Sequence, residues 1–279
     1  MNSTVKFVCP HCRAELSLSN DSLLCDGCPR SWEMKEQIPC FVGEDFYWSE
    51  ISQGQTGQVL ESIRRDGWEI GAVQYIREKF PQMYGYIFQP ERSNGLFLLP
   101  LSNQSTVLDI GCGFGTLSVC LSDKCKEVYA VDGGFERIMF LDFWRKFESK
   151  LNIQPVIADI LHLPFPTNSF DVVVMNGVLE WVGLGIENID PLEAQNNVLH
   201  YVHEILTENG YIYIGIENRY GLDYIFGEAD HGGLRFTSLL PRWVADLYSH
   251  SVSGEKYRAY THSCGVYKEM LRDAGFHEV

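Results

Sequence analysis

Short apolar runs alternate with amphipathic stretches through the second half of the chain. Apolar runs of four to six residues that are rich in β-branched side chains predict buried strands, and the stretches between them predict helices. Five such runs follow one another: Val107–Ile110, Val128–Val131, Pro155–Ala158, Val172–Met175 and Tyr211–Ile216. Because strands that alternate with helices form βαβ units, we expect an α/β fold with a parallel sheet over residues 104–279.

A different pattern covers the first hundred residues. Residues 1–45 consist of short extended runs and tight turns, which predict a small domain of their own. Residues 46–103 carry apolar side chains at near-helical spacing and predict a helical linker or cap. The apolar positions that define this spacing are Val59, Ile63, Ile70, Val73 and Ile76.

The C-terminal end of the sequence carries one more prediction. Ser263–Ala274 has the pattern of a helix, and residues 275–279 have the pattern of the start of a strand. A sheet of this kind normally continues with another strand at that point. We therefore expect either a truncated chain or a sheet that lacks its last strand and leaves an edge exposed.

The charge balance narrows the range of partners. Asp and Glu number 37 against 22 Lys and Arg, which gives a formal net charge of -15. An acidic surface repels phosphate backbones, and no basic cluster offsets it, so nucleic acid is a disfavoured partner. Met1–Cys9 lack the pattern of a secretory signal, and no apolar run is long enough to span a bilayer. We expect a cytoplasmic protein.

Four of the nine cysteines form two C-x-x-C pairs separated by twelve residues. Each pair bends into a tight turn that aims two thiolates at one point, and two such turns give a tetrahedral site of four sulfurs, which suits zinc. The predicted ligands are Cys9, Cys12, Cys25 and Cys28. With four protein ligands no position stays open for water, so this zinc would be structural; a pair of disulfides is the alternative.

This segment resembles the zinc ribbons of bacterial rRNA guanine methyltransferases and of the small activator proteins of tRNA methyltransferases. Trp32 and Ile38–Val42 are similar to the strand that closes those ribbons. Cys28 stands where the ribbon of the rRNA enzymes has a histidine ligand, so the resemblance does not carry their substrate over to this chain.

A glycine-rich turn directly follows the first predicted strand of the α/β region. Gly111, Gly113 and Gly115 lie between the strand and a predicted helix that begins at Thr116. Glycines let the backbone approach a ligand closely, and the helix N-terminus adds oriented N–H donors. Dinucleotide-binding turns need a third glycine one residue later, where this chain has Thr116. With Asp109 two residues before the first glycine, the turn resembles motif I of the class I S-adenosylmethionine-dependent methyltransferases; capping of the turn is the other role open to Asp109.

Later strands supply matching side chains in the right order. Asp132, at the end of the second strand, can accept hydrogen bonds from ribose hydroxyls, as acids do at this position of nucleotide-binding sheets. The resemblance implies that Asp159 accepts from the adenine amino group and that Ile160 covers the ring. It also places Asn176 in the loop beside the methionine end of the cofactor. The implied fold is a Rossmann-like class I methyltransferase sheet preceded by the zinc ribbon, with S-adenosylmethionine as cofactor.

The acceptor site is predicted in a long excursion after the fifth strand, at about residues 218–262. Excursions of this length are often substrate lids, and this one resembles bacterial methyltransferases associated with surface-glycan biosynthesis. His231, flanked by glycines, is the first candidate for a general base, and His262 is the second. A role for His231 in hydrogen bonding within the lid is the alternative.

These predictions favour an enzyme that transfers a methyl group from S-adenosylmethionine to an oxygen atom of a small-molecule or glycan acceptor. One alternative is an rRNA or tRNA base methyltransferase that uses its ribbon to contact RNA, against which the acidic charge argues. Another is a non-enzymatic scaffold that binds the cofactor and recruits a partner.

Overall fold

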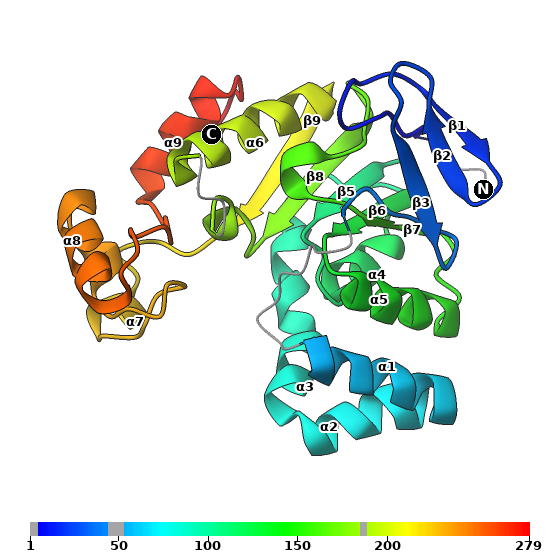
Figure 1. Cartoon of the computed structure of the whole chain (residues 1–279), viewed down its shortest axis with the longest axis horizontal. Helices are drawn as coiled ribbons and strands as arrows, with labels where there is room; N and C mark the ends of the chain where they lie inside the picture. Colours follow the sequence, from blue (N-terminus) through cyan, green and yellow to red (C-terminus); the bar gives the residue numbers. More distant parts are fainter. Residues whose placement is uncertain (1–4, 44–52, 185–188) are drawn as a thin grey trace. The chain divides into compact units, whose positions relative to one another are not determined.

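The computed structural model describes residues 5–43, 53–184 and 189–279 of the chain (Figure 1). The chain divides into two compact units. The first unit comprises Met1–Met175 and Ile205–Tyr213, and the second comprises Asn176–Glu204 and Ile214–Val279.

A five-stranded sheet forms the centre of the first unit, with the strand order β7-β6-β5-β8-β9. The strands are β5 (Thr106–Ile110), β6 (Glu127–Asp132), β7 (Ile153–Ile157), β8 (Phe170–Asn176) and β9 (Leu206–Gly215). Strand β5 pairs in parallel with both β6 and β8, and β6 pairs in parallel with β7. The chain order therefore reverses beside β5, and in open α/β sheets ligands bind at such a reversal, outside the carboxyl ends of the strands. The predicted α/β fold of the Rossmann-like type is confirmed by this strand order and by the parallel pairing of β5, β6, β7 and β8.

Two helices cover one face of this sheet. Helix α4 (Thr116–Ser122) and helix α5 (Phe135–Phe147) pack against β5, β6 and β7 (Figure 1). The sheet and the two helices are rich in fully buried apolar side chains. Because β5 and β6 are buried throughout, their sequences are almost continuous apolar runs. Gly115 stands at the start of α4 with a φ of 95°, and a Cβ there would lie 2.3 Å from Leu141 of α5.

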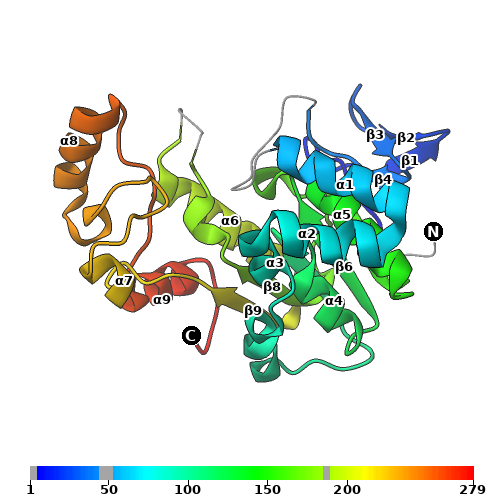
Figure 2. The same ribbon diagram turned by 90° about the horizontal axis from the view of Figure 1, so that it is seen from below.

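The helical region predicted over residues 46–103 forms a second helical layer. It contains α1 (Gln53–Trp68), a π-helical segment (Glu69–Gln74), α2 (Tyr75–Lys79), α3 (Pro81–Ile87) and a 3-10 segment (Pro90–Leu98). Helix α1 packs on α5 (Figure 2). The Trp68 ring stacks on Trp144 of α5 with centroids 5.6 Å apart and contacts Phe140 at 5.0 Å. These large aromatic contacts join the region to the sheet domain.

The cysteine-rich segment forms a separate four-stranded antiparallel sheet in the order β1-β2-β3-β4. Its strands are β1 (Leu16–Ser19), β2 (Ser22–Cys25), β3 (Ser31–Lys35) and β4 (Ile38–Pro39). The chain then continues alongside the edge strand β7: Cys40 forms a parallel bridge with Ile157, and the Phe41 amide donates to the Ile157 carbonyl at 2.7 Å. The division into ribbon, helical cap and catalytic domain stays a prediction.

The second unit contains α6 (Pro191–Ile205), α7 (Leu222–Ile225), α8 (Arg242–Ser253) and α9 (Cys264–Asp273), with 3-10 turns at Leu179–Trp181 and Thr237–Leu239. Helix α9 confirms the predicted C-terminal helix, and the Ser263 side chain caps it by accepting from the Val266 amide. The strand predicted at residues 275–279 is wrong: these residues form neither strand nor helix, because Gly275 ends the helix with a φ of 102° and the Phe276 amide donates back to Leu271. None of the helices in the described ranges has the length and apolar character needed to cross a bilayer.

The close crossing at Gly71 yields a stability prediction. A Cβ at Gly71 would lie 2.3 Å from the Ser62 carbonyl oxygen of α1, and backbone atoms cannot move aside. We expect Gly71→Ala to lower the free energy of unfolding by about 2 kcal/mol or more. Gly57→Ala is the matched control in α1, because nothing lies within 4 Å of its Cβ position, and it should raise stability by about 0.5–1 kcal/mol. Urea unfolding would measure both; equal effects of the two substitutions would contradict the prediction.

Candidate active site

The glycine bend after β5 leaves its backbone open at Gly113. Gly111, Gly113 and Gly115 have φ values of 66°, 56° and 95°, in the left-handed region that favours glycine. Nothing lies within 4 Å of the position of a Cβ at Gly113. The bend is attached to the neighbouring strand β6, since the Cys112 amide donates to the Val131 carbonyl at 2.9 Å. A ligand can therefore approach the backbone here without meeting a side chain.

Asp132 lies directly beside this bend. One carboxylate oxygen accepts from the Gly113 amide at 3.0 Å, and the other accepts from the Gly134 amide at 2.8 Å. Arg137 adds an ion pair at 3.4 Å, and only 7% of Asp132 is exposed. Each carboxylate oxygen has two lone pairs, so Asp132 can still accept a further hydrogen bond, such as one from a ribose hydroxyl.

Asp159 follows β7 and caps a 3-10 turn. Its carboxylate accepts from the Leu161 amide at 3.0 Å and contacts His162 Nδ1 at 3.2 Å. The hydrogen bond to Asp159 raises the pKa of His162. Ile160, predicted to cover the adenine ring, begins the turn that Asp159 caps. These positions follow the parallel strands β6 and β7, so the two acids stand at the carboxyl edge of neighbouring strands.

Asp109 has a different environment from the other acids. It is 2% exposed and accepts from the Ser118 hydroxyl of α4 at 2.6 Å, so it fastens the helix behind the bend. Burial raises the pKa of Asp109 to about 7, with a smaller contribution from the neighbouring Asp132. Asp109 thus ties the end of β5 to α4, and its predicted contact with the cofactor stays a prediction, as do those of the two strand-end acids. Asn176 is the last residue of β8.

The four predicted zinc ligands come together at the N-terminal sheet. Their sulfur atoms all lie within 4.8 Å of one another, with Cys12 and Cys25 at 3.3 Å and Cys9 and Cys28 at 3.8 Å. Four sulfurs about 2.3 Å from one ion are about 3.8 Å apart in a tetrahedron, so this spacing fits zinc. Gly27 allows the second turn to close, because a Cβ there would lie 2.6 Å from Ala14.

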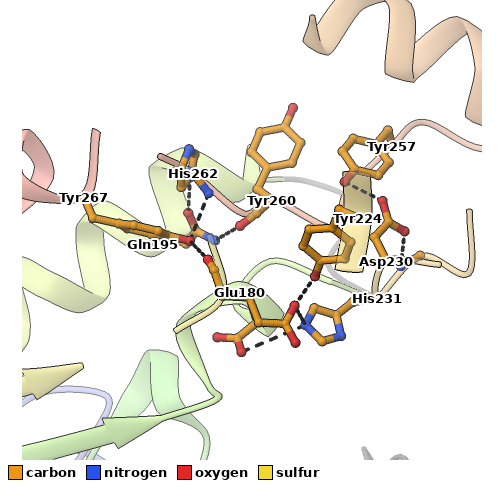
Figure 3. Close-up of polar contacts among 11 residues, drawn as sticks. Glu180, Gln195, Tyr224, Asp230, His231, Tyr257, Tyr260, His262 and Tyr267 are labelled. Atoms are coloured by element: carbon orange, nitrogen blue, oxygen red, sulfur yellow. Dashed lines mark hydrogen bonds and ion pairs between the residues drawn. The ribbon is translucent and has the colours of Figure 1, made fainter. Parts of the chain in front are cut away.

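In the second unit, His231 lies among acidic and aromatic side chains (Figure 3). Its Nε2 is 3.2 Å from a Glu217 oxygen and 4.0 Å from a Glu180 oxygen. The ring packs on Trp181 with centroids 4.0 Å apart, and the Tyr224 hydroxyl donates to Glu217. The hydrogen bond from His231 lowers the pKa of Glu217, which keeps this carboxylate charged. If Nε2 donates to Glu217, the lone pair resides on Nδ1, which can take a proton.

His262 lies in a second polar group of the same unit (Figure 3). It is 6% exposed, and its Nε2 contacts the Gln195 amide oxygen at 2.8 Å. The Gln195 amide nitrogen donates to two carbonyls, those of Leu179 and Tyr260, which fixes its oxygen toward the histidine. Burial, together with a smaller effect of the positive charges of Arg242 and Arg219, lowers the pKa of His262 to about 4. This ring is neutral at physiological pH.

Sequence reasoning selected the two histidines but not the side chains around them. Glu180 and Trp181 follow the fourth strand, and Glu217 follows the fifth, as the predicted strand ends allow. Their position directly after a predicted strand is the sequence feature that could have identified them as site residues. Their contacts with His231 depend on how the backbone of residues 218–231 folds, and these residues show no helical or strand periodicity from which that fold could be predicted.

The pKa of Asp109 predicts how stability depends on pH. The carboxyl holds its proton up to about pH 7 in the folded chain but only to about 3.8 when unfolded, so stability falls as the pH rises across this window. Asp109→Asn keeps an acceptor for Ser118 but cannot ionise. We expect the wild type to lose stability relative to this variant between pH 4 and 7, as measured by urea unfolding at stepped pH. Exposed Asp273→Asn is the control; a constant difference between wild type and Asp109→Asn would contradict the assignment.

Comparisons with known proteins agree with this geometry. A family model described as a methyltransferase domain matches residues 108–214. The chain is 27% identical over 124 residues to a demethylmenaquinone methyltransferase of Bacillus licheniformis, with 43% of this chain and 50% of the relative covered. It is 27% identical over 190 residues to a ubiquinone biosynthesis O-methyltransferase of Salmonella paratyphi A, with 67% of this chain and 70% of the relative covered.

The match thus spans about half the length of the first of these relatives. Among solved structures, a putative methyltransferase from Bacillus halodurans is similar at 14% identity and a TM-score of 0.48, over 67% of this chain and 69% of that one. The fold, the open glycine bend and the family match identify residues 108–214 as an S-adenosylmethionine-dependent methyltransferase domain of class I.

Proposed function

We propose that this protein transfers a methyl group from S-adenosylmethionine to an oxygen atom of a small-molecule or glycan acceptor. The observation that carries the choice of oxygen is the contact of His231 with Glu217, because a hydroxyl acceptor needs a base. The names of the two curated relatives support it: both are methyltransferases of quinones or their precursors by name, and one is an O-methyltransferase.

The donor would be held by residues at the carboxyl ends of the strands β5 to β8. The amides of residues 111–115 and the Asp132 carboxylate would bind the adenosyl part, with Asp159 and Ile160 at the adenine and Asn176 beside the methionine portion. When bound, S-adenosylmethionine supplies an activated methyl group that an acceptor oxygen can take by in-line displacement. Asp132 is already fixed by two amides, so it is oriented before any ligand arrives.

His231 would remove the proton from the acceptor hydroxyl as the new C–O bond forms. Nδ1 accepts this proton, and the carboxylates of Glu217 and Glu180 stabilise the positive ring that results. Trp181 packs against the ring and fixes its plane. His262, the second candidate, is a weaker base because burial lowers its pKa to about 4.

The N-terminal sheet would hold one structural zinc ion through Cys9, Cys12, Cys25 and Cys28. We assign it no part in the methyl transfer, since four protein ligands leave no open position. Residues 5–43 include five acidic residues and four Lys or Arg residues, so this segment has no excess of positive charge that would favour RNA. None of the nine cysteines, all of which lie in the described ranges, forms a disulfide, which fits a reducing compartment such as the cytoplasm.

The role of His231 predicts a selective loss of activity. We expect His231→Gln to lower the methylation rate by about 100- to 10,000-fold, because it removes the base, while the affinity for S-adenosylmethionine stays unchanged. Mass analysis after incubation of the protein and S-adenosylmethionine with fractionated cell extract would identify the product, and isothermal titration would measure donor binding.

His200→Gln is the matched control, since His200 is an exposed side chain on α6. If isothermal titration of the wild type with S-adenosylmethionine shows no heat of binding, the proposed function is refuted. Equal rates for His231→Gln and His200→Gln would remove His231 from the mechanism without touching the donor site.

The cysteine geometry predicts one zinc ion per chain. Cys28→Ser should lose the metal and lower the melting temperature, because metal binding supplies folding free energy to small domains of this kind. Elemental analysis and thermal unfolding would measure both effects. Cys264→Ser, at an exposed cysteine outside the cluster, should retain one equivalent of zinc; a metal-free wild type grown with ample zinc would refute the site.

A further inference from the structure

Two arginines of the second unit have no acidic partner among the residues that the structure describes. Arg219 donates through Nη2 to the Leu240 carbonyl at 2.8 Å, and Arg242 donates through Nη2 to the Thr261 carbonyl at 2.6 Å. A carbonyl satisfies a donor but does not neutralise a charge. Burial lowers the pKa of Arg242, and repulsion from Arg219 adds to this effect. In a chain of net charge -15, two cations that lack counter-ions need an explanation.

Several buried donor atoms on the same stretch of chain, residues 219–261, also lack a hydrogen-bond partner. Arg219 Nε and Arg242 Nη1 are buried and have no hydrogen-bond partner, and the same holds for the hydroxyls of Ser238 and Thr261, each 1% exposed. Buried polar groups without partners are costly, so they mark either strain or a missing ligand. Four such groups on residues 219–261 favour a ligand.

The two arginines gather around the same short segment. The main-chain amide of Arg219 donates to the His262 carbonyl at 3.1 Å, while the Arg242 guanidinium lies over the Tyr260 ring, 4.0 Å from its centroid. Both charges act on the buried His262 ring. The stacking on Tyr260 fixes the plane of the Arg242 guanidinium group and thereby orients its unpaired Nη1 atom.

Two carboxylates of the same unit, those of Asp230 and Glu217, are engaged elsewhere. Asp230 accepts from the Tyr257 hydroxyl at 2.7 Å and from the Gly232 amide at 2.9 Å. Glu217 contacts His231 and Tyr224. The positive charge of the two arginines is therefore left for a group that is not part of these contacts.

We propose that Arg219 and Arg242 form a subsite that binds an anionic group, a carboxylate or a phosphate, of the methyl acceptor. The inference rests on the proposed function, because it names the acceptor's chemical class. Both ligands present paired oxygens that match the planar fork of a guanidinium, and the buried hydroxyls of Ser238 and Thr261 can donate further hydrogen bonds. The carboxylate of the methyl donor has the same chemistry, so the test must separate the two sources.

The test uses the full chain with zinc bound and two probes, inorganic phosphate and benzoate, each titrated at constant ionic strength against sodium chloride. Thermal unfolding gives an apparent dissociation constant for each probe. We expect saturable stabilisation of the wild type and at least tenfold weaker binding by Arg219→Gln and Arg242→Gln. Arg235→Gln is the matched control, because Arg235 is exposed in the same segment and should bind the probes as the wild type does.

A second measurement keeps the test valid if a variant fails to fold. In the wild type, saturating probe should shift the ring resonances of His262 and leave those of exposed His200 unchanged. The relative affinities for phosphate and benzoate then show which anion the subsite prefers.

Three outcomes would overturn the proposal: no saturable effect of either probe on the wild type, equal binding by the glutamine variants, or a tenfold loss of S-adenosylmethionine affinity in those variants. The last would assign the arginines to the donor. A wild type that binds S-adenosylmethionine but neither probe refutes this subsite alone, whereas one that binds the probes but not S-adenosylmethionine refutes the proposed function and leaves an anion site.

Discussion

The hydrogen bond from the Gly113 amide to Asp132 connects the two elements on which the proposed donor site depends. It ties the bend after β5 to the end of β6, the neighbouring parallel strand. Because Gly134 binds the other oxygen, the carboxylate cannot turn away from the bend. The backbone angles that bring the amide to this point lie in the region that glycine adopts most readily, so the glycine motif favours the turn that places this amide beside the carboxylate.

Much of this arrangement could be predicted from local patterns. Buried parallel strands appear as apolar runs, and the runs at Val107–Ile110 and Val128–Val131 fall within β5 and β6. The glycine spacing and the C-x-x-C pairs are equally local, since each motif sets its own turn. The start of β9 at Leu206 was missed because Thr207, Glu208, Asn209 and Gly210 have the composition of a turn, yet they lie in the strand.

The surroundings of the candidate base could not be predicted in this way. Glu180, Glu217 and His231 are far apart in the sequence and meet through irregular backbone that has no period. The same applies to Arg219 and Arg242, whose lack of an acidic partner is a property of packing. Asp109 shows the converse: its place in the motif was clear, but its burial behind α4, and hence its raised pKa, required the structure.

The pairing of the cysteine-rich segment with β7 has a consequence for the whole sheet. Residues 40 and 41 occupy hydrogen-bonding positions along a strand that would otherwise form an open border. An unprotected border of this kind is a template for association with other chains. The cysteine-rich segment thus covers this edge of the sheet, and a shortened protein that begins after residue 43 would lack this contact and be more prone to aggregate.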